Sequence, residues 1–181
     1  MKPFSKAAIL LLLIFFVASC ITVRFENPQP ADGKRLNKFP EYLVGVYSNE
    51  ESDTLHIGKN SFKFKDDTVN ISGKVSADEF VLNEFEGYHI LNIQTDNIWD
   101  VYLVKRTNGS INVYTFQFDS DKIEDLLEKL NKITPVKQVK GDDDELDYLL
   151  INPTSAQFRE IIDAGIISSS IEFTLLNGEE E

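Results

Sequence analysis

Between Tyr42 and Phe118 the chain alternates short stretches of apolar and polar residues with turn signals. Within these stretches apolar positions tend to recur at every second residue, which is typical of strands with one buried face. The breaks carry glycine, asparagine or aspartate, the residues that favour tight turns. Eight such stretches can be read, at 42–48, 53–57, 61–65, 68–73, 78–85, 88–94, 97–106 and 111–118. Short strands at this spacing predict an antiparallel β-meander, folded as a barrel or a sandwich.

The dipeptide Asn108-Gly109 sets the register of one predicted hairpin. Type I′ turns need positive φ at both central residues, and Asn-Gly is the strongest signal for them. A two-residue loop pairs Thr107 with Ser110, and the pairing then extends outward. One face of the hairpin would be wholly apolar and is expected to form core, through the pairs Leu103–Tyr114, Val101–Phe116 and Trp99–Phe118. The other face would be mixed, through the pairs Val104–Val113, Tyr102–Thr115 and Asp100–Gln117.

A second hairpin is predicted to turn at Glu86-Gly87. Its register is less sharply defined by the sequence, because Glu-Gly fits a type I′ turn less well than Asn-Gly does. The expected cross-strand pairs are Phe80–Ile93, Leu82–Leu91 and Glu84–His89.

The C-terminal third changes to a helical period. Apolar residues form one stripe of an amphipathic helix at Ile123, Leu126, Leu127, Leu130 and Ile133. Asp119 or Ser120 is expected to cap this helix, and Pro135 to end it. Its exposed side is expected to carry two i,i+4 ion pairs, Asp125–Lys129 and Glu128–Lys132.

A second helix is predicted after a short strand at 147–151. Thr154 and Gln157 form a capping box, Phe158, Ile161 and Ile162 face inward, and Gly165 ends the helix. A last strand is expected at 171–176. The fold class is therefore α+β, an antiparallel meander of about eight strands followed by two amphipathic helices and one or two further strands.

The first residues have the layout of a secretory signal peptide. Lys2 and Lys6 precede an unbroken apolar run, Ala7–Val17, and the small residues Ala18 and Ser19 follow it. The run is shorter than the roughly 20 residues that a membrane-spanning helix needs. Residues 1–19 are therefore expected to be removed from the mature protein.

Val17-Ala18-Ser19-Cys20 resembles the lipobox of bacterial lipoproteins, in which an aliphatic residue and two small residues precede cysteine. The sequence departs from the commonest form in having Val17 where leucine is most frequent. The resemblance implies cleavage between Ser19 and Cys20 and a covalent lipid on Cys20, which would then bind the bilayer. Ile21 is not the aspartate that retains enteric lipoproteins at the inner membrane, which implies an outer-membrane location. The alternative for Cys20 is a free thiol or an intermolecular disulfide.

Residues 20–38 are interpreted as a flexible, lipidated tether. The segment Glu26–Lys34 holds prolines and a glycine without apolar periodicity, as linkers do. A single globular domain is then expected over residues 39–181, because its length suits one core and the chain holds no second cysteine for an internal disulfide.

The chain is acidic, with 30 aspartates and glutamates against 18 lysines and arginines and a net charge of −12. Such a body is repelled by nucleic acids and by anionic lipid surfaces. No nucleic-acid partner is therefore expected, and attachment to a bilayer would rest on the lipid. The run Asp142–Glu145 lacks the ligand spacing of a calcium loop and is interpreted as a solvated turn.

Few residues offer chemistry. His56 and His89 lie on separate predicted strands without a third ligand, and no nucleophile elbow or phosphate loop occurs. No catalytic residue, metal site or cofactor other than the lipid is therefore predicted. The preferred function is a non-catalytic binding or structural domain with an envelope protein as partner.

Two alternatives remain at this stage. The strand region has a weak resemblance to lipocalin-like barrels, in which Gly45-Val46-Tyr47 stands where lipocalins often have Gly-x-Trp. That resemblance implies a carrier of a small apolar ligand, with a pocket lined by Trp99, Tyr102, Tyr114 and Phe116. The third hypothesis is an envelope hydrolase, which would need carboxylates gathered in a cleft. The chain otherwise resembles small uncharacterised envelope lipoproteins.

Overall fold

The structure is a computed structural model that describes residues 20–75, 78–168 and 170–176. The predicted signal peptide, with Ser19 at its cleavage site, lies outside the described residues. Cys20 is the first residue described.

The predicted strand meander is present. A 3-10 turn at Glu41–Leu43 opens the first predicted stretch, and the eighth divides into two short strands. The strands are β3 (Gly45–Ser48), β4 (Thr54–Ile57), β5 (Ser61–Lys65), β6 (Asn70–Lys74), β7 (Phe80–Phe85), β8 (Tyr88–Thr95), β9 (Ile98–Thr107), β10 (Ser110–Tyr114) and β11 (Gln117–Asp119). The antiparallel α+β class is confirmed, with more strands than the sequence indicates.

The two predicted helices and the C-terminal strands are also present, as α2 (Ile123–Ile133), α3 (Ser155–Asp163), β13 (Leu146–Ile151) and β14 (Ile171–Leu175). Three strands were not anticipated, namely β1 (Cys20–Phe25), β2 (Lys34–Leu36) and β12 (Val136–Lys140). The prediction that Asp119 or Ser120 caps α2 is wrong, because a 3-10 turn at Ser120–Lys122 leads into the helix and no side chain caps it. The Thr154–Gln157 capping box of α3 is confirmed.

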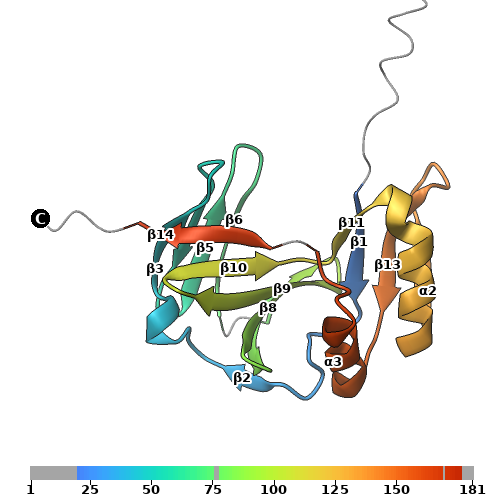
Figure 1. Ribbon diagram of the computed structural model, residues 1–181, viewed down its shortest axis with the longest axis horizontal. Coiled ribbons are helices and arrows are strands. Elements are labelled where there is room, and N and C mark those ends of the chain that lie inside the picture. The colour runs from blue at the N-terminus through green and yellow to red at the C-terminus, as the bar shows by residue number, and fades with distance from the viewer. Residues whose placement is uncertain (1–19, 76–77, 169, 177–181) are drawn as a thin grey trace, which may run out of the picture.

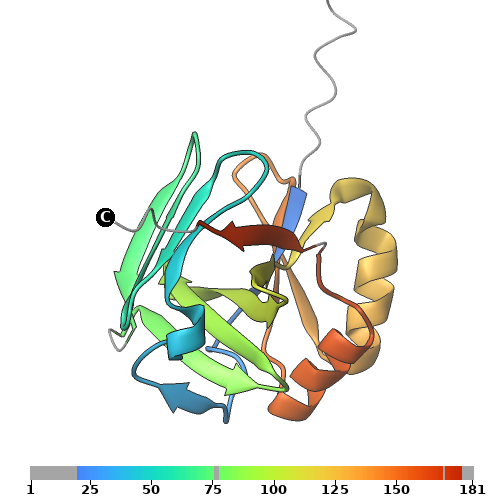
Figure 2. The ribbon, with the colours of Figure 1, turned by 60° about the vertical axis from the view of Figure 1, so that its left-hand side comes forward.

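The described strands form one sheet whose path runs β12-β13-β1-β9-β10-β14-β3-β4-β5-β6. Strand β9 also pairs with β8, and β8 continues to β7 and β2. The pairs are antiparallel except that β1 and β13 run parallel. Figures 1 and 2 show the sheet curling into a half-barrel, with α2 and α3 on the side of β1 and β13. The insertion of β14 between β10 and β3 departs from the sequential strand order of an up-and-down meander.

The Asn108-Gly109 hairpin follows the predicted register only near its turn. Thr107 faces Ser110, Val104 faces Val113 and Leu103 faces Tyr114. Beyond Tyr114 the chain leaves β9 for β1, where Ile21 pairs with Phe118 and the Val23 amide donates to the Phe116 carbonyl over 2.8 Å. The expected pairs beyond that point are therefore wrong, namely Val101–Phe116, Trp99–Phe118, Tyr102–Thr115 and Asp100–Gln117. Trp99 faces Phe25 of β1 and Gln94 of β8 instead.

The Glu86-Gly87 hairpin has the predicted register throughout. All three expected pairs form, Phe80–Ile93, Leu82–Leu91 and Glu84–His89. Glu86 and Gly87 have φ of 50° and 78°, as a type I′ turn requires.

Two hydrophobic cores lie on opposite faces of the central strands. The first, here called the helix core, packs Val101 and Leu103 of β9 against β1, β13, α2 and α3. The second, the sheet core, lies inside the half-barrel and includes Val104 of β9, with Tyr102 and Val113 packed against it. The mixed face of the hairpin is thus also a core face, contrary to expectation. Helices cover one side of these strands and the curled sheet covers the other.

The interpretation of residues 20–38 as a flexible tether is wrong. Ile21, Val23 and Phe25 alternate into the helix core, so β1 is a buried strand between β13 and the β9–β11 side of the sheet. The proline-containing segment that follows is held by side-chain amides. The Asn92 and Asn83 amides donate to the Gln29 carbonyl over 3.0 and 2.9 Å. Residues 20–38 therefore belong to the folded domain, contrary to the predicted boundary at residue 39.

Candidate functional site

The residues predicted to line an apolar pocket do not converge. Trp99 and Phe116 are buried in the helix core, and Tyr114 packs against that core. Tyr102 lies on the opposite face of β9, against the sheet core. The interior of the half-barrel is filled by large side chains that include Tyr47, Phe62 and Phe173. The arrangement gives the lipocalin-like carrier hypothesis no support.

The pKa of Tyr102 is strongly shifted, and the charged groups around it form contacts between strands. Burial, and next the charge of Asp100, raise the pKa of Tyr102 to about 12, while the Arg24 charge opposes this shift. Arg24 and Asp100 form a two-point ion pair, with Nε–Oδ1 and Nη2–Oδ2 distances both of 2.9 Å. The Arg24 guanidinium also lies 5.3 Å from the ring centroid of Tyr148. These contacts tie β1 to β9 and β13.

His89 is buried, with 5 % of its surface exposed, and lies opposite Glu84 as predicted. Its Nε2 lies 3.3 Å from the hydroxyl of Tyr42, and Arg106 donates from Nη1 to the Tyr42 carbonyl over 2.6 Å. Burial lowers the pKa of His89, and the charge of Glu84 opposes this shift. The His89 ring thus helps to hold the 3-10 turn at Glu41–Leu43, which precedes β3, against β8. His56, by contrast, is exposed.

Cys20 is exposed and opens β1, where it faces Asp119 of β11. Asp119 in turn pairs with Lys122 over 2.6 Å. A cut between Ser19 and Cys20 would remove no residue of the described fold. The thiol is accessible to an attached lipid without any rearrangement of the strand.

The acidic run at residues 142–145 forms the turn between β12 and β13. The Glu145 amide donates to the Asp143 carboxylate over 3.2 Å, and Lys140 pairs with Asp144 over 2.9 Å. Within the described ranges no group of three or more histidine, cysteine, aspartate or glutamate side chains is placed to hold a metal ion.

The exposed side of β3–β6 is the surface with the most distinctive composition. Cross-strand registers align Val46, His56, Lys63 and Ser72 in one row. Their neighbours in sequence point the other way, into the sheet core. We call this surface the outer face and define it by Val46, Ser48, Thr54, His56, Ser61, Lys63, Lys65, Asn70, Ser72 and Lys74.

The outer face carries cations without carboxylates, in a chain of net charge −12. Lys63, Lys65 and Lys74 are exposed and make no ion pair with any described residue. The turn that joins β5 to β6 does hold carboxylates, and Asp66 there accepts the amides of Thr68 and Val69 over 2.6 and 2.5 Å. The positive charge is therefore greatest toward Lys74 and the opposite turn, which holds Lys59.

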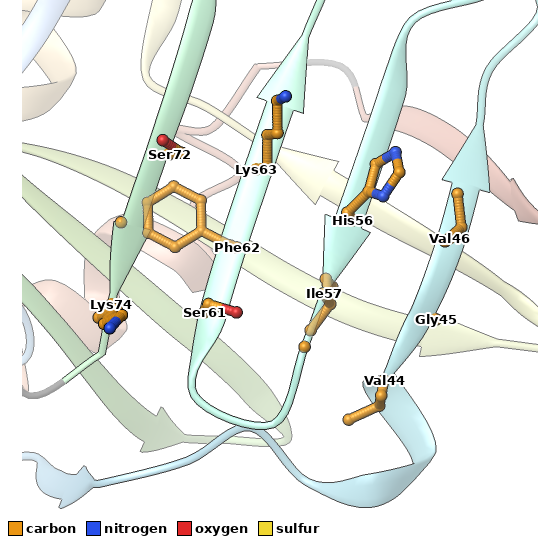
Figure 3. Close-up of a pocket in the computed structure, with 12 residues that line it drawn as sticks. Val44, Gly45, Val46, His56, Ile57, Ser61, Phe62, Lys63, Ser72 and Lys74 are labelled. Carbon is orange, nitrogen blue, oxygen red and sulfur yellow. The ribbon is translucent and has the colours of Figure 1, made fainter.

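A shallow groove of about 640 Å³ crosses this positive end of the outer face. Figure 3 shows Lys63, His56 and Val46 rising from three adjacent strands, with Ser72 on the fourth. Gly73 on β6 also borders the groove, and its missing side chain leaves room for the Phe80 ring, which would lie 2.8 Å from a Cβ there. The groove thus offers cations and hydroxyls over an apolar floor, which suits an anionic, extended ligand better than a compact apolar one.

Sequence reasoning missed this surface, although the signal was present. The stretches 61–65 and 68–73 were recognised as strands, and alternation alone places their lysines and hydroxyl residues on one side. The predicted meander also makes these strands neighbours. Lys74, however, lies one residue beyond the predicted stretch 68–73, so the third lysine of this face falls outside the predicted strands.

Comparisons with known proteins found no match to a family model, to a curated protein or to a solved structure. Among the described helices, none combines the length and apolar character needed to cross a membrane.

Proposed function

We propose that the protein is a cell-envelope lipoprotein, anchored through a lipid on Cys20, whose β-rich domain is a non-catalytic binding module. The observation that carries the binding role is the outer face, where three lysines that form no ion pair with any described residue gather on a chain of net charge −12. We place the anchor in the outer membrane, since Ile21 follows the cysteine. The partner is an anionic component of the envelope.

The position of Cys20 supports this proposal. The cysteine is exposed at the first residue of β1, and the residues that follow it form a strand of the sheet, not a tether. The domain would therefore sit directly on the lipid surface. Figures 1 and 2 place β3–β6 on the side of the molecule away from β1 and the helices, so the outer face stays open to a partner.

Anchoring is tested by fractionation and lipid labelling of the full chain. The unchanged protein should pellet with membranes and incorporate labelled palmitate, and Cys20→Ser should do neither, because acyl chains supply the membrane affinity. Val17→Leu is the matched control, since it moves the cleavage motif toward its commonest form and keeps the cysteine. A Cys20→Ser protein that remains in the membrane fraction would refute the anchor.

Binding is tested by crosslinking in intact envelopes followed by recovery of the lipoprotein. The variant Lys63→Gln/Lys65→Gln/Lys74→Gln should lose its crosslinked partner, because the partner is held by those charges. The matched control, Lys122→Gln/Lys129→Gln/Lys132→Gln, removes the same charge from the α2 side and should keep the partner. Equal recovery with both variants would remove the binding role from the outer face.

A further inference from the structure

We infer that the outer face receives an extended acidic segment of another protein, which adds as a new strand along the free edge of β6. The inference rests on the proposed binding function and names the class of partner. It also states how that partner is held, through backbone hydrogen bonds to β6 and ion pairs with the lysines of the outer face.

Strand β6 ends the sheet. In the described residues it pairs with β5 alone. Edge strands expose unpaired backbone groups that can accept another strand, and many peptide-binding domains use such edges. β6 is five residues long, which is enough for a short segment to pair along it.

Hydrogen-bond alternation identifies which backbone groups are free. The Gly58 amide donates to the Ser61 carbonyl over 2.8 Å, so Ser61 and every second residue after it direct their backbone groups toward β4. The intervening β5 residues bond to Ile71 and Gly73 of β6. The amides and carbonyls of Asn70, Ser72 and Lys74 therefore point to the open edge.

The same three residues have their side chains on the outer face. A strand added beside β6, about 4.8 Å away, would present alternate side chains to this face. Lys74 would be the nearest cation, and Lys63 and Lys65 lie one strand further in. Acidic residues at every second position of the added strand would meet these lysines, which lack partners among the described residues. Apolar side chains on the other face would find Phe80, which already packs against Phe62.

Charge argues against a second copy of this chain as the occupant, and position argues against a bilayer. A second copy of this chain pairing through β6 would extend the outer face with a second set of the same lysines and no carboxylates, which is unfavourable. Figure 1 shows β1, whose first residue is Cys20, on the other side of the molecule from β6, so a bilayer anchored at Cys20 would lie away from this edge. An acidic polypeptide segment satisfies both the lysines and the unpaired backbone, whereas an anionic lipid or glycan satisfies only the lysines.

The test uses the full chain in mild detergent and an eight-residue peptide that alternates glutamate and threonine. Amide hydrogen exchange is measured for β6 with and without saturating peptide. The amides of Ser72 and Lys74 should exchange at least about tenfold more slowly with peptide, because new hydrogen bonds protect them. Ile71 and Gly73 serve as internal controls, since β5 already protects their amides, and their exchange should change little.

Methylated peptides separate strand pairing from charge attraction without altering the protein. Methyl groups on alternate backbone nitrogens block one edge of a strand, and the two possible patterns block opposite edges. One pattern should abolish binding and the other should leave it within about threefold, because only one edge faces β6. The lysine-to-glutamine variant of the outer face should bind the unmethylated peptide about tenfold more weakly, and the α2 control variant should bind it normally.

Several results would overturn the inference. Equal binding of both methylated peptides would show attraction without strand pairing. Anionic vesicles or dextran sulfate that bind through the lysines, while the peptide leaves the β6 amides unprotected, would overturn strand addition and keep the proposed function. Slow exchange at Ser72 and Lys74 in the free protein would show that this chain covers its own edge. Failure of every anion, with no effect of the lysine variant, would overturn the proposed binding role as well.

Discussion

At the scale of single residues, His89 gives the fold a defined response to pH. Burial lowers the pKa of His89 in the folded state, so the unfolded chain binds a proton more readily. Above the unfolded pKa of about 6.5 both states are neutral at this residue and stability is unaffected. As the pH falls below that value, the unfolded state is favoured, and the loss levels off below the folded-state pKa.

We therefore expect the free energy of unfolding to fall through His89 as the pH drops below about 6.5. Denaturant titrations at several pH values measure it. In His89→Gln this part of the pH dependence should be smaller, whereas in His56→Gln, which alters an exposed histidine, it should persist. An unchanged pH profile in His89→Gln would contradict the assignment.

The Arg24–Asp100 pair is a second prediction at this scale. The pair is two-pointed and partly buried, and Arg24 also packs on Tyr148. Asp100→Asn should destabilise the fold by about 1–3 kcal/mol, because it leaves the guanidinium without its countercharge. Lys34→Gln, which breaks the exposed pair with Glu84, should cost less than about 1 kcal/mol in the same unfolding titration. Equal losses would show that burial does not distinguish the two pairs.

Single residues also show where sequence reasoning reached its limit. The wrong tether at 20–38 came from the prolines and the glycine, which are typical of linkers. The alternation of Ile21, Val23 and Phe25 was present but short, and it followed directly on an apolar leader. The contacts that hold this segment come from Asn83 and Asn92, more than fifty residues away in sequence. Local composition carries no information about such contacts.

At the scale of elements, the strand registers that were predicted correctly are those next to tight two-residue turns. Asn108-Gly109 and Glu86-Gly87 set the strand registers next to them, because positive φ at both positions permits few loop geometries. The turn at Asp96-Asn97 has the same geometry, with φ of 53° and 64°, yet its residues were assigned no hairpin. The failure beyond Tyr114 has another cause. After Tyr114 the chain no longer pairs with β9, and the next strand, β11, pairs with β1 instead. No local sequence signal marks this change of pairing partner.

Gly109 offers a direct test of the turn argument. Its φ is 91° and a Cβ added there would meet no heavy atom within 4 Å, so Gly109→Ala changes backbone strain and little else. We expect a loss of about 1–2 kcal/mol in an unfolding titration, which is the cost of a left-handed conformation with a Cβ. Gly141→Ala is the control, since Gly141 has no positive φ, and it should change stability by less than about 0.5 kcal/mol. A neutral Gly109→Ala would argue against the type I′ turn.

At the scale of the whole molecule, the central strands separate two cores, and this arrangement was not readable from the sequence. The predicted apolar face of β9 is buried, as expected, but its mixed face is buried too, against Tyr47, Phe173 and their neighbours. A face with polar members suggested solvent, because the pattern was judged one hairpin at a time. The half-barrel closes over that face only when distant strands pair, above all β14 with β3 and β10.

The outer face, by contrast, is built from hairpins between strands that follow one another in sequence, and Cys20 opens the first described strand. The proposed lipid anchor at Cys20 and the cationic outer face lie on different sides of the molecule. The central proposal is that Cys20 is the lipidated first residue of the mature protein. The binding proposals describe what that anchored domain then holds.

The intact mass of the protein purified from its host membrane, with sequencing of its N-terminal peptide, tests this claim most directly. The account predicts a chain that begins at Cys20 and carries a diacylglyceryl group on that residue. A chain that retains residues before Cys20, or one whose Cys20 is unmodified, would contradict it.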